Sequence, residues 1–257
     1  MAAPAGETNG KPALADFSEE ERALRIQLAA AHRLADKFGM SELIYTHISL
    51  RVPGPTPTYL FKPHQLLFSE ITASNLVRVD LAGNIIGHSE YRVNPAGTGI
   101  HGTILEARPD VNCVFHSHSP YAVAVSSIEG GLLPLTQASL RFTAQIGYHD
   151  YAGAAVNPVE CSRLAEDFGD NQVMLLRNHG VLTTGETASE AFIAAFYLER
   201  ACQFQILAQA SGQPLIMPMV EGRARVRQGP DRLSGRVDDA WPALLRMLDR
   251  EDPTYRD

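Results

Sequence analysis

The decapeptide VNCVFHSHSP, residues 111–120, carries the pattern that decides the fold. Its first five residues form a short apolar run typical of a buried strand, and Ser119-Pro120 is a helix N-cap followed by a first-turn proline. Side chains two positions apart on a strand share a face, so His116 and His118 point to the same side. The decapeptide therefore predicts a strand-to-helix junction at which two imidazoles converge.

Short strands and helices are expected on both sides of this junction. A capping box at Ser18 and Glu21, followed by apolar residues at helical spacing, predicts a first helix that ends at Gly39. Residues 43–80 change to short β-type runs broken by Pro and Gly. Further helices are expected over about 98–107 and 121–127, from a cap at Thr187 to Gly212, and over about 238–249. Strands are expected over 172–178 and 180–185. Such a mixture around one core predicts an α/β or α+β domain.

The composition is that of an ordinary globular protein. The chain has 257 residues, 45% of them hydrophobic and 20% charged, which suffices for one sizeable core. Its formal net charge of −7, with no dense basic cluster beyond RARVR at 223–227, argues against nucleic acid as a partner. Three widely spaced cysteines indicate reduced thiols. Because no leader and no long apolar run is recognisable, we expect no membrane association and a cytoplasmic location.

A third histidine stands at another expected strand end. His179 lies in RNHG, where Gly180 would let the backbone turn or approach another segment closely. Three imidazoles can hold Zn²⁺ or another divalent metal and leave a coordination position open. The spacing alone does not bring His179 to His116 and His118, and strand-end histidines are also compatible with structural hydrogen bonds.

Three longer stretches resemble the class II aldolase and adducin family. They begin with NPAGTGIHG at residue 94 and run to 134, continue with YHDYAG at 148–153, and end with VMLLRNHGVLTTGETASEAF at 173–192. The similarity spans about residues 20–212. It implies an α/β fold, a three-layer α/β/α domain with a central, largely antiparallel mixed sheet, and commonly a homotetramer with active sites at subunit interfaces. It places the metal ligands on His116, His118 and His179, with zinc expected and manganese, iron or cobalt as alternatives.

The chain divides into three parts on this interpretation. Residues 1–16 are poor in large apolar groups and are predicted to be a disordered tail. Residues 17–212 form the family-like domain. Residues 213–257 are expected to be a C-terminal extension with one helix that packs at a subunit interface.

The departures from the family pattern concern the substrate. Members that cleave sugar phosphates have an acidic residue about nineteen positions before the first metal histidine, and Gly97 occupies that place here. The phosphate-binding Gly-Asn pair corresponds to Thr46-His47, and a Ser-Ser pair corresponds to Pro95-Ala96. Glycine transfers no proton, so the aldolase mechanism does not carry over intact. A phosphorylated substrate is disfavoured.

Other residues could replace the missing acid. Imidazole and phenol groups can transfer protons near neutral pH if they are positioned at the site, although each could equally serve a structural hydrogen bond. His47 could also pair with a substrate carboxylate. The predicted set is His101, Tyr148 and His149 for catalysis and His47, Asn94 and Gly97 for substrate binding.

A Lewis-acidic metal stabilises negative charge on substrate oxygens, as aldol cleavage and decarboxylation both require. We therefore expect a metal-dependent carbon–carbon lyase, a decarboxylase or aldolase, acting on a small non-phosphorylated keto or hydroxy acid or an aromatic carboxylate. Decarboxylation is favoured because it needs only one proton donor. The alternatives are a non-catalytic, adducin-like binding or assembly module and an Fe(II)-dependent oxygenase on the same fold, which metal identity and oxygen dependence would distinguish.

Overall fold

The computed structural model describes residues 14–153, 157–219 and 233–257. A seven-stranded sheet in the order β3-β2-β1-β4-β7-β6-β5 forms its centre. Every neighbouring pair is antiparallel except β5 and β6. The strands are β1 (His47–Val52), β2 (Thr58–Phe61), β3 (Val77–Asp80), β4 (Cys113–Ser117), β5 (Ile146–His149), β6 (Val173–Leu176) and β7 (Gly180–Gly185).

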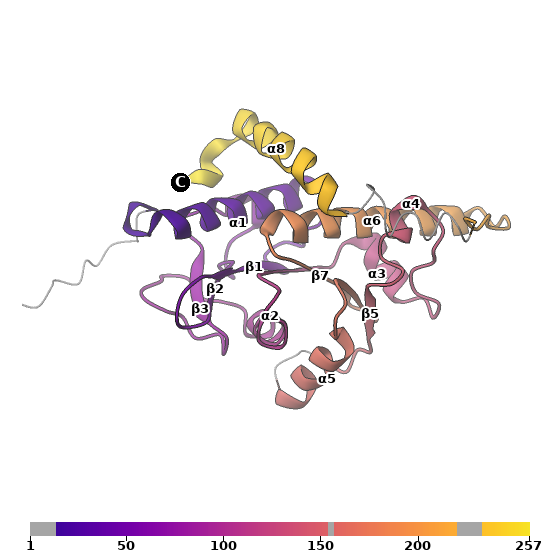
Figure 1. Ribbon diagram of the computed structural model, residues 1–257, viewed down its shortest axis with the longest axis horizontal. Coiled ribbons are helices and arrows are strands. Elements are labelled where there is room, and N and C mark those ends of the chain that lie inside the picture. Colours follow the sequence, from indigo (N-terminus) through magenta and orange to yellow (C-terminus); the bar gives the residue numbers. More distant parts are fainter. Residues whose placement is uncertain (1–13, 154–156, 220–232) are drawn as a thin grey trace, which may run out of the picture.

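Helices cover both faces of this sheet (Figure 1). On one face lie α1 (Glu19–Lys37), α6 (Ala188–Ala210) and α8 (Leu233–Glu251), and on the other lie α2 (Pro95–Ala107) and α5 (Pro158–Phe168). The short helices α3 (Pro120–Ser126) and α4 (Gln137–Leu140) pack against α6. The described residues also form the 3₁₀ turns η1 (Leu14–Asp16), η2 (Phe68–Glu70) and η3 (Pro253–Arg256). The three-layer α/β/α architecture with a largely antiparallel mixed sheet is thus confirmed.

Alternation along the central strands divides the buried side chains between the two faces. Ile48 and Phe115 join the core under α1 and α6, whereas Val114 joins the core under α2 and α5. His47 pairs with His116 in the register of β1 and β4. By alternation, both histidines face the α2 side, which makes them neighbours on one surface of the sheet.

The predicted helices that begin after Ser18 and Thr187 form where the sequence indicated, and the capping residues explain why. The Ser18 hydroxyl accepts a hydrogen bond from Glu21 N at 3.1 Å. The Thr187 hydroxyl accepts one from Glu190 N at 3.2 Å. Helix α2 begins before the predicted residue 98, because the Asn94 side chain caps it by accepting from Ala96 N at 3.2 Å.

The two ends of the chain differ in part from expectation. Of the tail predicted at 1–16, residues 1–13 lie outside the described residues, and Leu14–Asp16 form the turn η1 rather than a disordered segment. Helix α8 packs on α1 and α6 of its own chain. There Trp241 is buried and its Nε1 donates to Gln27 Oε1 at 2.6 Å. The expected subunit interface of this extension remains a prediction.

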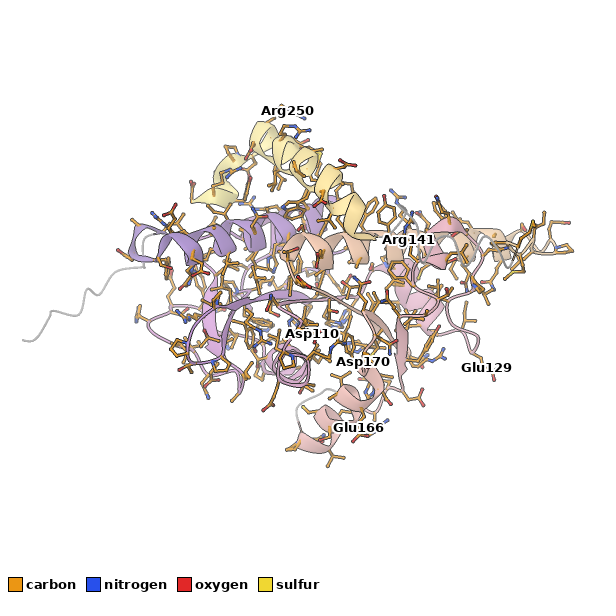
Figure 2. The ribbon with its side chains drawn as sticks, viewed as in Figure 1. Asp110, Glu129, Arg141, Glu166, Asp170 and Arg250 are labelled. Carbon is orange, nitrogen blue, oxygen red and sulfur yellow. The ribbon has the colours of Figure 1, made fainter. Side chains whose placement is uncertain are left out.

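Charged side chains lie at the periphery of the layers. Figure 2 shows Arg250 on α8 and Glu166 on α5 at opposite outer faces of the molecule. Cys113, Cys161 and Cys202 form no disulfide within the described residues. Within the parts of the chain that the structure describes, no helix combines the length and apolar character needed to cross a membrane.

Stability is expected to depend on pH through His32, which lies on α1 and is fully buried. Its Nδ1 donates to the Leu28 carbonyl at 2.8 Å, its Nε2 has no hydrogen-bond partner among the described residues, and burial lowers its pKa to about 3. The usual pKa is about 6.5, so the unfolded chain binds a proton first as the pH falls. The free energy of unfolding should therefore fall between pH 6.5 and 3, with His32 contributing up to about 1.4 kcal/mol per pH unit.

Urea unfolding at several pH values checks this prediction. His32→Phe keeps a ring against Phe68 and should give a shallower pH dependence than the wild type. His88→Gln, at an exposed position, should leave the dependence unchanged. Equal slopes for wild type and His32→Phe would contradict the assignment.

Candidate metal site and its surroundings

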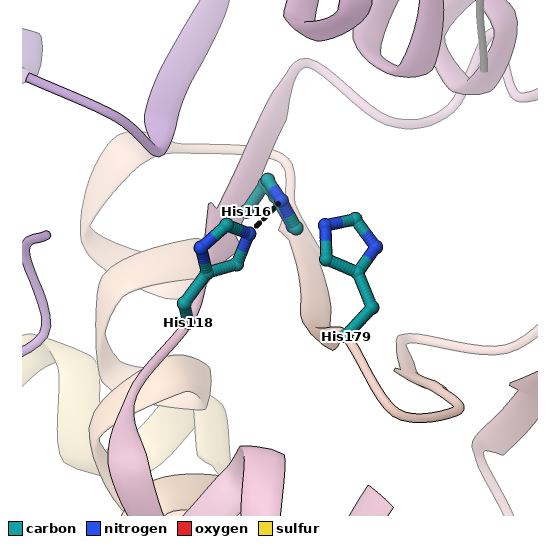
Figure 3. Close-up of side chains that lie close together, drawn as sticks. All are labelled: His116, His118 and His179. Atoms are coloured by element: carbon teal, nitrogen blue, oxygen red, sulfur yellow. Dashed lines mark hydrogen bonds between the residues drawn. The ribbon is translucent and has the colours of Figure 1, made fainter. Parts of the chain in front are cut away.

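His116, His118 and His179 meet in space (Figure 3). His116 lies in β4, His118 directly follows that strand, and His179 lies in the turn between β6 and β7. Their ligand nitrogens all lie within 4.8 Å of one another, and His116 Nε2 is 3.0 Å from His118 Nε2. Zn–N bonds of about 2.0–2.1 Å in a tetrahedron separate ligand nitrogens by about 3.4 Å. The spacing of the three rings is therefore close to what one divalent ion requires.

The turn that carries His179 is held by tight backbone packing. Asn178 adopts a left-handed conformation with φ of 57°. A Cβ on Gly180 would collide with the carbonyl oxygen of Ser117 and lie 3.0 Å from His118 Cδ2. Glycine is thus needed where β7 meets the end of β4, as the sequence suggested, and this close approach brings His179 to His118.

Two of the three imidazoles, His116 and His179, are held in the neutral form that binds metals. Burial, followed by the neighbouring His47, holds the pKa of His116 well below its usual value. Burial and the nearby His118 lower the pKa of His179 to about 4. Neutral imidazoles keep a lone pair available at neutral pH. Together with His118, these two donors make a set of three imidazoles that fits a divalent metal with a coordination position left open for substrate or water.

Two of the three rings are oriented by acceptors on their outer nitrogens. His116 Nδ1 lies 3.0 Å from the Val181 carbonyl, and His118 Nδ1 lies 2.6 Å from Glu42 Oε2. A carbonyl or a carboxylate accepts only, so Nδ1 carries the proton in both rings. Nε2 is then left as the ligand atom that faces the triad.

Glu42 comes from a conformationally strained loop between α1 and β1. Within this loop Leu43 and Thr46 have positive φ of 48° and 60°, which is unusual for branched side chains. The buried Lys62 holds the loop by donating from Nζ to the Ile44 carbonyl at 2.9 Å, and burial lowers the Lys62 pKa to about 8. Such strain is typical of functional sites. No sequence pattern had indicated Glu42.

Replacing Glu42 should weaken metal binding without abolishing it. Glu42→Gln removes the charged acceptor of the His118 N–H, and loss of such a partner typically lowers metal affinity about 10- to 100-fold. Competition with a chromophoric chelator measures the change. Glu106→Gln, an exposed substitution on α2, is the matched control and should bind Zn²⁺ like the wild type. Equal affinity of Glu42→Gln and Glu106→Gln would refute the role of Glu42.

A line of buried polar groups runs from the triad into the protein. The rings of His47 and His116 are 5.2 Å apart. His47 Nδ1 lies 2.9 Å from His101 Nε2, and His101 Nδ1 lies 2.6 Å from Ser49 Oγ. Burial is the main cause that holds the pKa of both His47 and His101 well below the usual value. His101 is fully buried, so it contacts His47 rather than a substrate.

His47 fills the space above Gly97. A Cβ on Gly97 would lie within 3.0 Å of Nε2, Cδ2 and Cε1 of the His47 ring. An acidic side chain at position 97 and an imidazole at position 47 are therefore incompatible in this arrangement. The His47 imidazole thus occupies the space beside position 97, where the family resemblance would lead one to expect an acidic side chain.

The side chains of the remaining predicted residues have partners other than the triad. Asn94 uses its side chain as the α2 cap. The Tyr148 hydroxyl accepts from Leu132 N at 3.2 Å, and its ring packs in the core near α6 rather than toward the triad. His149, which is buried, has both ring nitrogens engaged, with Asp167 at 2.7 Å and Glu160 at 2.9 Å.

Besides Glu42, two residues near the triad were missed. The ring of Tyr151 lies 5.7 Å from that of His179 and is largely exposed. Glu160 lines a small cavity together with His179 and Tyr151. The motif YHDY contains both Tyr148 and Tyr151. Strand β5 ends at His149, and only this structural detail shows that Tyr151 is the tyrosine that faces the site.

Comparisons with known proteins agree with this picture. Residues 26–206 match the family model described as Class II Aldolase and Adducin N-terminal domain. A Caulobacter vibrioides protein named as a candidate class 2 aldolase is 44% identical over 245 residues, 93% of this chain and 94% of that protein. Alpha-adducin of Rattus norvegicus is 37% identical over 265 residues, 97% of this chain but 36% of its own length. The crystal structure of an aldolase II superfamily protein from Pseudomonas syringae is 43% identical, covers 94% of this chain and 98% of that one, and has a TM-score of 0.87.

Proposed function

Because the chain belongs to the class II aldolase and adducin family, we propose that it is a metal-dependent carbon–carbon lyase acting on a small, non-phosphorylated keto or hydroxy acid or aromatic carboxylate. The observation that carries the proposal is the triad of imidazoles whose ligand nitrogens lie within 4.8 Å of one another. A bound metal supplies Lewis-acid stabilisation of negative charge on substrate oxygens. Zinc is our first choice of metal, with manganese, iron or cobalt as alternatives.

His47 is the proposed proton-transfer group. Its ring lies beside His116 and covers Gly97, so it takes the place of the acid found in sugar-phosphate aldolases. The neutral His47 ring can donate a proton from Nε2 if Nδ1 takes one from His101 Nε2 at the same time, and it can accept a proton at Nε2 while Nδ1 donates to His101. His101 and Ser49 hold the ring through that bond, so His101 acts as a positioning residue.

The surroundings of His47 support a substrate without a phosphate. Pro95 at the start of α2 has no backbone N–H, and Ala96 has no hydroxyl. The imidazole also occupies the pocket position at which the resemblance places the phosphate-binding asparagine. With one proton-transfer group in reach, decarboxylation is favoured over aldol cleavage. Tyr151, beside His179, is proposed to contact the substrate at the open side.

The alternative of a non-catalytic adducin-like module rests on the similarity to alpha-adducin across nearly the whole chain. The convergent triad favours the enzyme, because a scaffold has no need for three imidazoles whose ligand nitrogens converge. An Fe(II)-dependent oxygenase would use the same donors. We also propose a homotetramer, as the family resemblance implies, and a cytoplasmic location, as expected from the sequence.

The test is turnover by metal-loaded protein. Wild-type protein reconstituted with Zn²⁺, Mn²⁺, Co²⁺ or Fe²⁺ is incubated, in parallel without and with oxygen, with a panel of keto acids, hydroxy acids and aromatic carboxylates. We expect release of CO₂ or of an aldehyde that is lost in His116→Ala and reduced at least about 100-fold in His47→Phe. Turnover only with iron and oxygen would establish the oxygenase instead. Fully metallated protein without any turnover would favour the adducin-like module.

A further inference from the structure

A small cavity adjoins the metal site on the side of His179. Its volume is about 20 Å³, room for one water molecule. Its apolar walls come from α2, α5 and β6, and its polar walls are His149, Tyr151, Glu160 and His179. Apolar cavities stay dry, whereas a water is held where polar partners line the space. This cavity has both the size and the partners for one ordered water.

The cavity lies beside His179, which differs from the other two proposed metal ligands in the hydrogen bonding of its ring. His116 and His118 each donate from Nδ1 to a protein acceptor. No hydrogen bond to the His179 ring occurs within residues 14–153, 157–219 and 233–257. One nitrogen of that ring faces His116 and the other points away from the triad (Figure 3). Metal-bound histidines almost always donate their other N–H to an acceptor, so His179 needs one.

Glu160 is the charged acceptor on the cavity wall. It is buried on α5, where one carboxylate oxygen accepts from His149 Nε2 at 2.9 Å and the other accepts from Arg163 at 2.7 Å. Each carboxylate oxygen has two acceptor sites, so both retain capacity for a further bond. His149 is itself bonded to Asp167 at 2.7 Å, which keeps its ring and the Glu160 carboxylate in place.

We propose that one water in this cavity joins His179 to Glu160, which makes Glu160 the positioning residue of the third metal ligand. The outer N–H of His179 donates to the water, and the water donates to the carboxylate. His149 then serves to anchor Glu160 rather than to transfer a proton to the substrate. The inference rests on the proposed metal-binding role of the triad.

Metal affinity and ligand geometry test the bridge without relying on activity. Zn²⁺ affinity is measured by chelator competition, and the visible spectrum of the Co²⁺-loaded protein reports the ligand geometry. Glu160→Ala should bind Zn²⁺ about 10- to 100-fold more weakly and shift the Co²⁺ bands. Glu160→Gln keeps one acceptor oxygen and should show a smaller loss.

Two matched variants separate this role from general loss of α5 packing. Arg163→Ala removes the other partner of the Glu160 carboxylate, and Glu166→Gln changes an exposed residue of the same helix. Both should keep wild-type Zn²⁺ affinity and Co²⁺ spectrum. Wild-type values in a folded Glu160→Ala variant would overturn the bridge and leave the triad intact. Failure of the wild type to bind Zn²⁺ would overturn the metal site and the bridge together.

Discussion

His116→Ala is expected to lose the thermal stabilisation that divalent metal gives to the wild type. A ligand present at 1,000 times its dissociation constant stabilises the folded state by about 4 kcal/mol. For a chain of this size each kcal/mol shifts the midpoint of thermal unfolding by about 2–4 °C. Saturating Zn²⁺ should therefore raise the wild-type midpoint by on the order of 10 °C and leave that of His116→Ala nearly unchanged.

Thermal scans with and without metal make this measurement. The metal-free wild type and the metal-free variant should both unfold cooperatively, because His116 lies at the end of a strand whose partners β1 and β7 remain in place. His88→Gln, an exposed substitution, should respond to Zn²⁺ like the wild type. An equal rise in His116→Ala and the wild type would show that Zn²⁺ binds elsewhere.

Gly97→Ala is expected to displace His47, because the added Cβ would lie within 3.0 Å of three atoms of its ring. Overpacking of this kind costs about 1–3 kcal/mol. In the proposed reaction the displaced imidazole should cost at least about 100-fold in rate. Urea unfolding gives the first quantity and kcat/KM for the substrate found by the turnover screen gives the second.

The effect of Gly97→Ala on the free energy of unfolding should change sign when His47 is absent. In an His47→Ala background the added methyl meets no ring, and alanine is favoured over glycine inside a helix by about 0.5–1 kcal/mol. Gly97→Ala should then be neutral or stabilising. The double-mutant cycle isolates this coupling, since the two residues are in contact. Additive effects would show that His47 does not occupy the space above Gly97.

Local signals account for the parts of the fold that the sequence predicted. The caps at Ser18 and Thr187 are short-range interactions, so the pattern and the structure agree there. The apolar run before His116 predicted the strand that ends at these histidines. The alternation of side chains along a strand predicted that His116 and His118 share a face. The meeting of these residues with His179 required the family resemblance, because the pairing of β4 with β7 joins distant segments.

The surroundings of the triad depend on contacts that sequence patterns do not encode. The position of His47 over Gly97 arises from the register of β1 with β4 and the packing of α2 on the sheet. The alternation of side chains along β5 directs Tyr148 into the core near α6. Tyr151 is therefore the tyrosine near the metal site. Glu42 reaches His118 only through a loop with two residues at positive φ. The sequence and its family resemblance identified the metal ligands. The roles of the surrounding side chains could be assigned only from the tertiary structure.

Metal analysis by inductively coupled plasma mass spectrometry tests the central claim most directly. Untagged wild-type protein is purified without chelator beside His118→Ala. We predict about one equivalent of zinc, manganese, cobalt or iron per chain in the wild type and none in the variant. No metal in either protein, even after reconstitution, or equal metal in both would contradict a metal centre built on His116, His118 and His179.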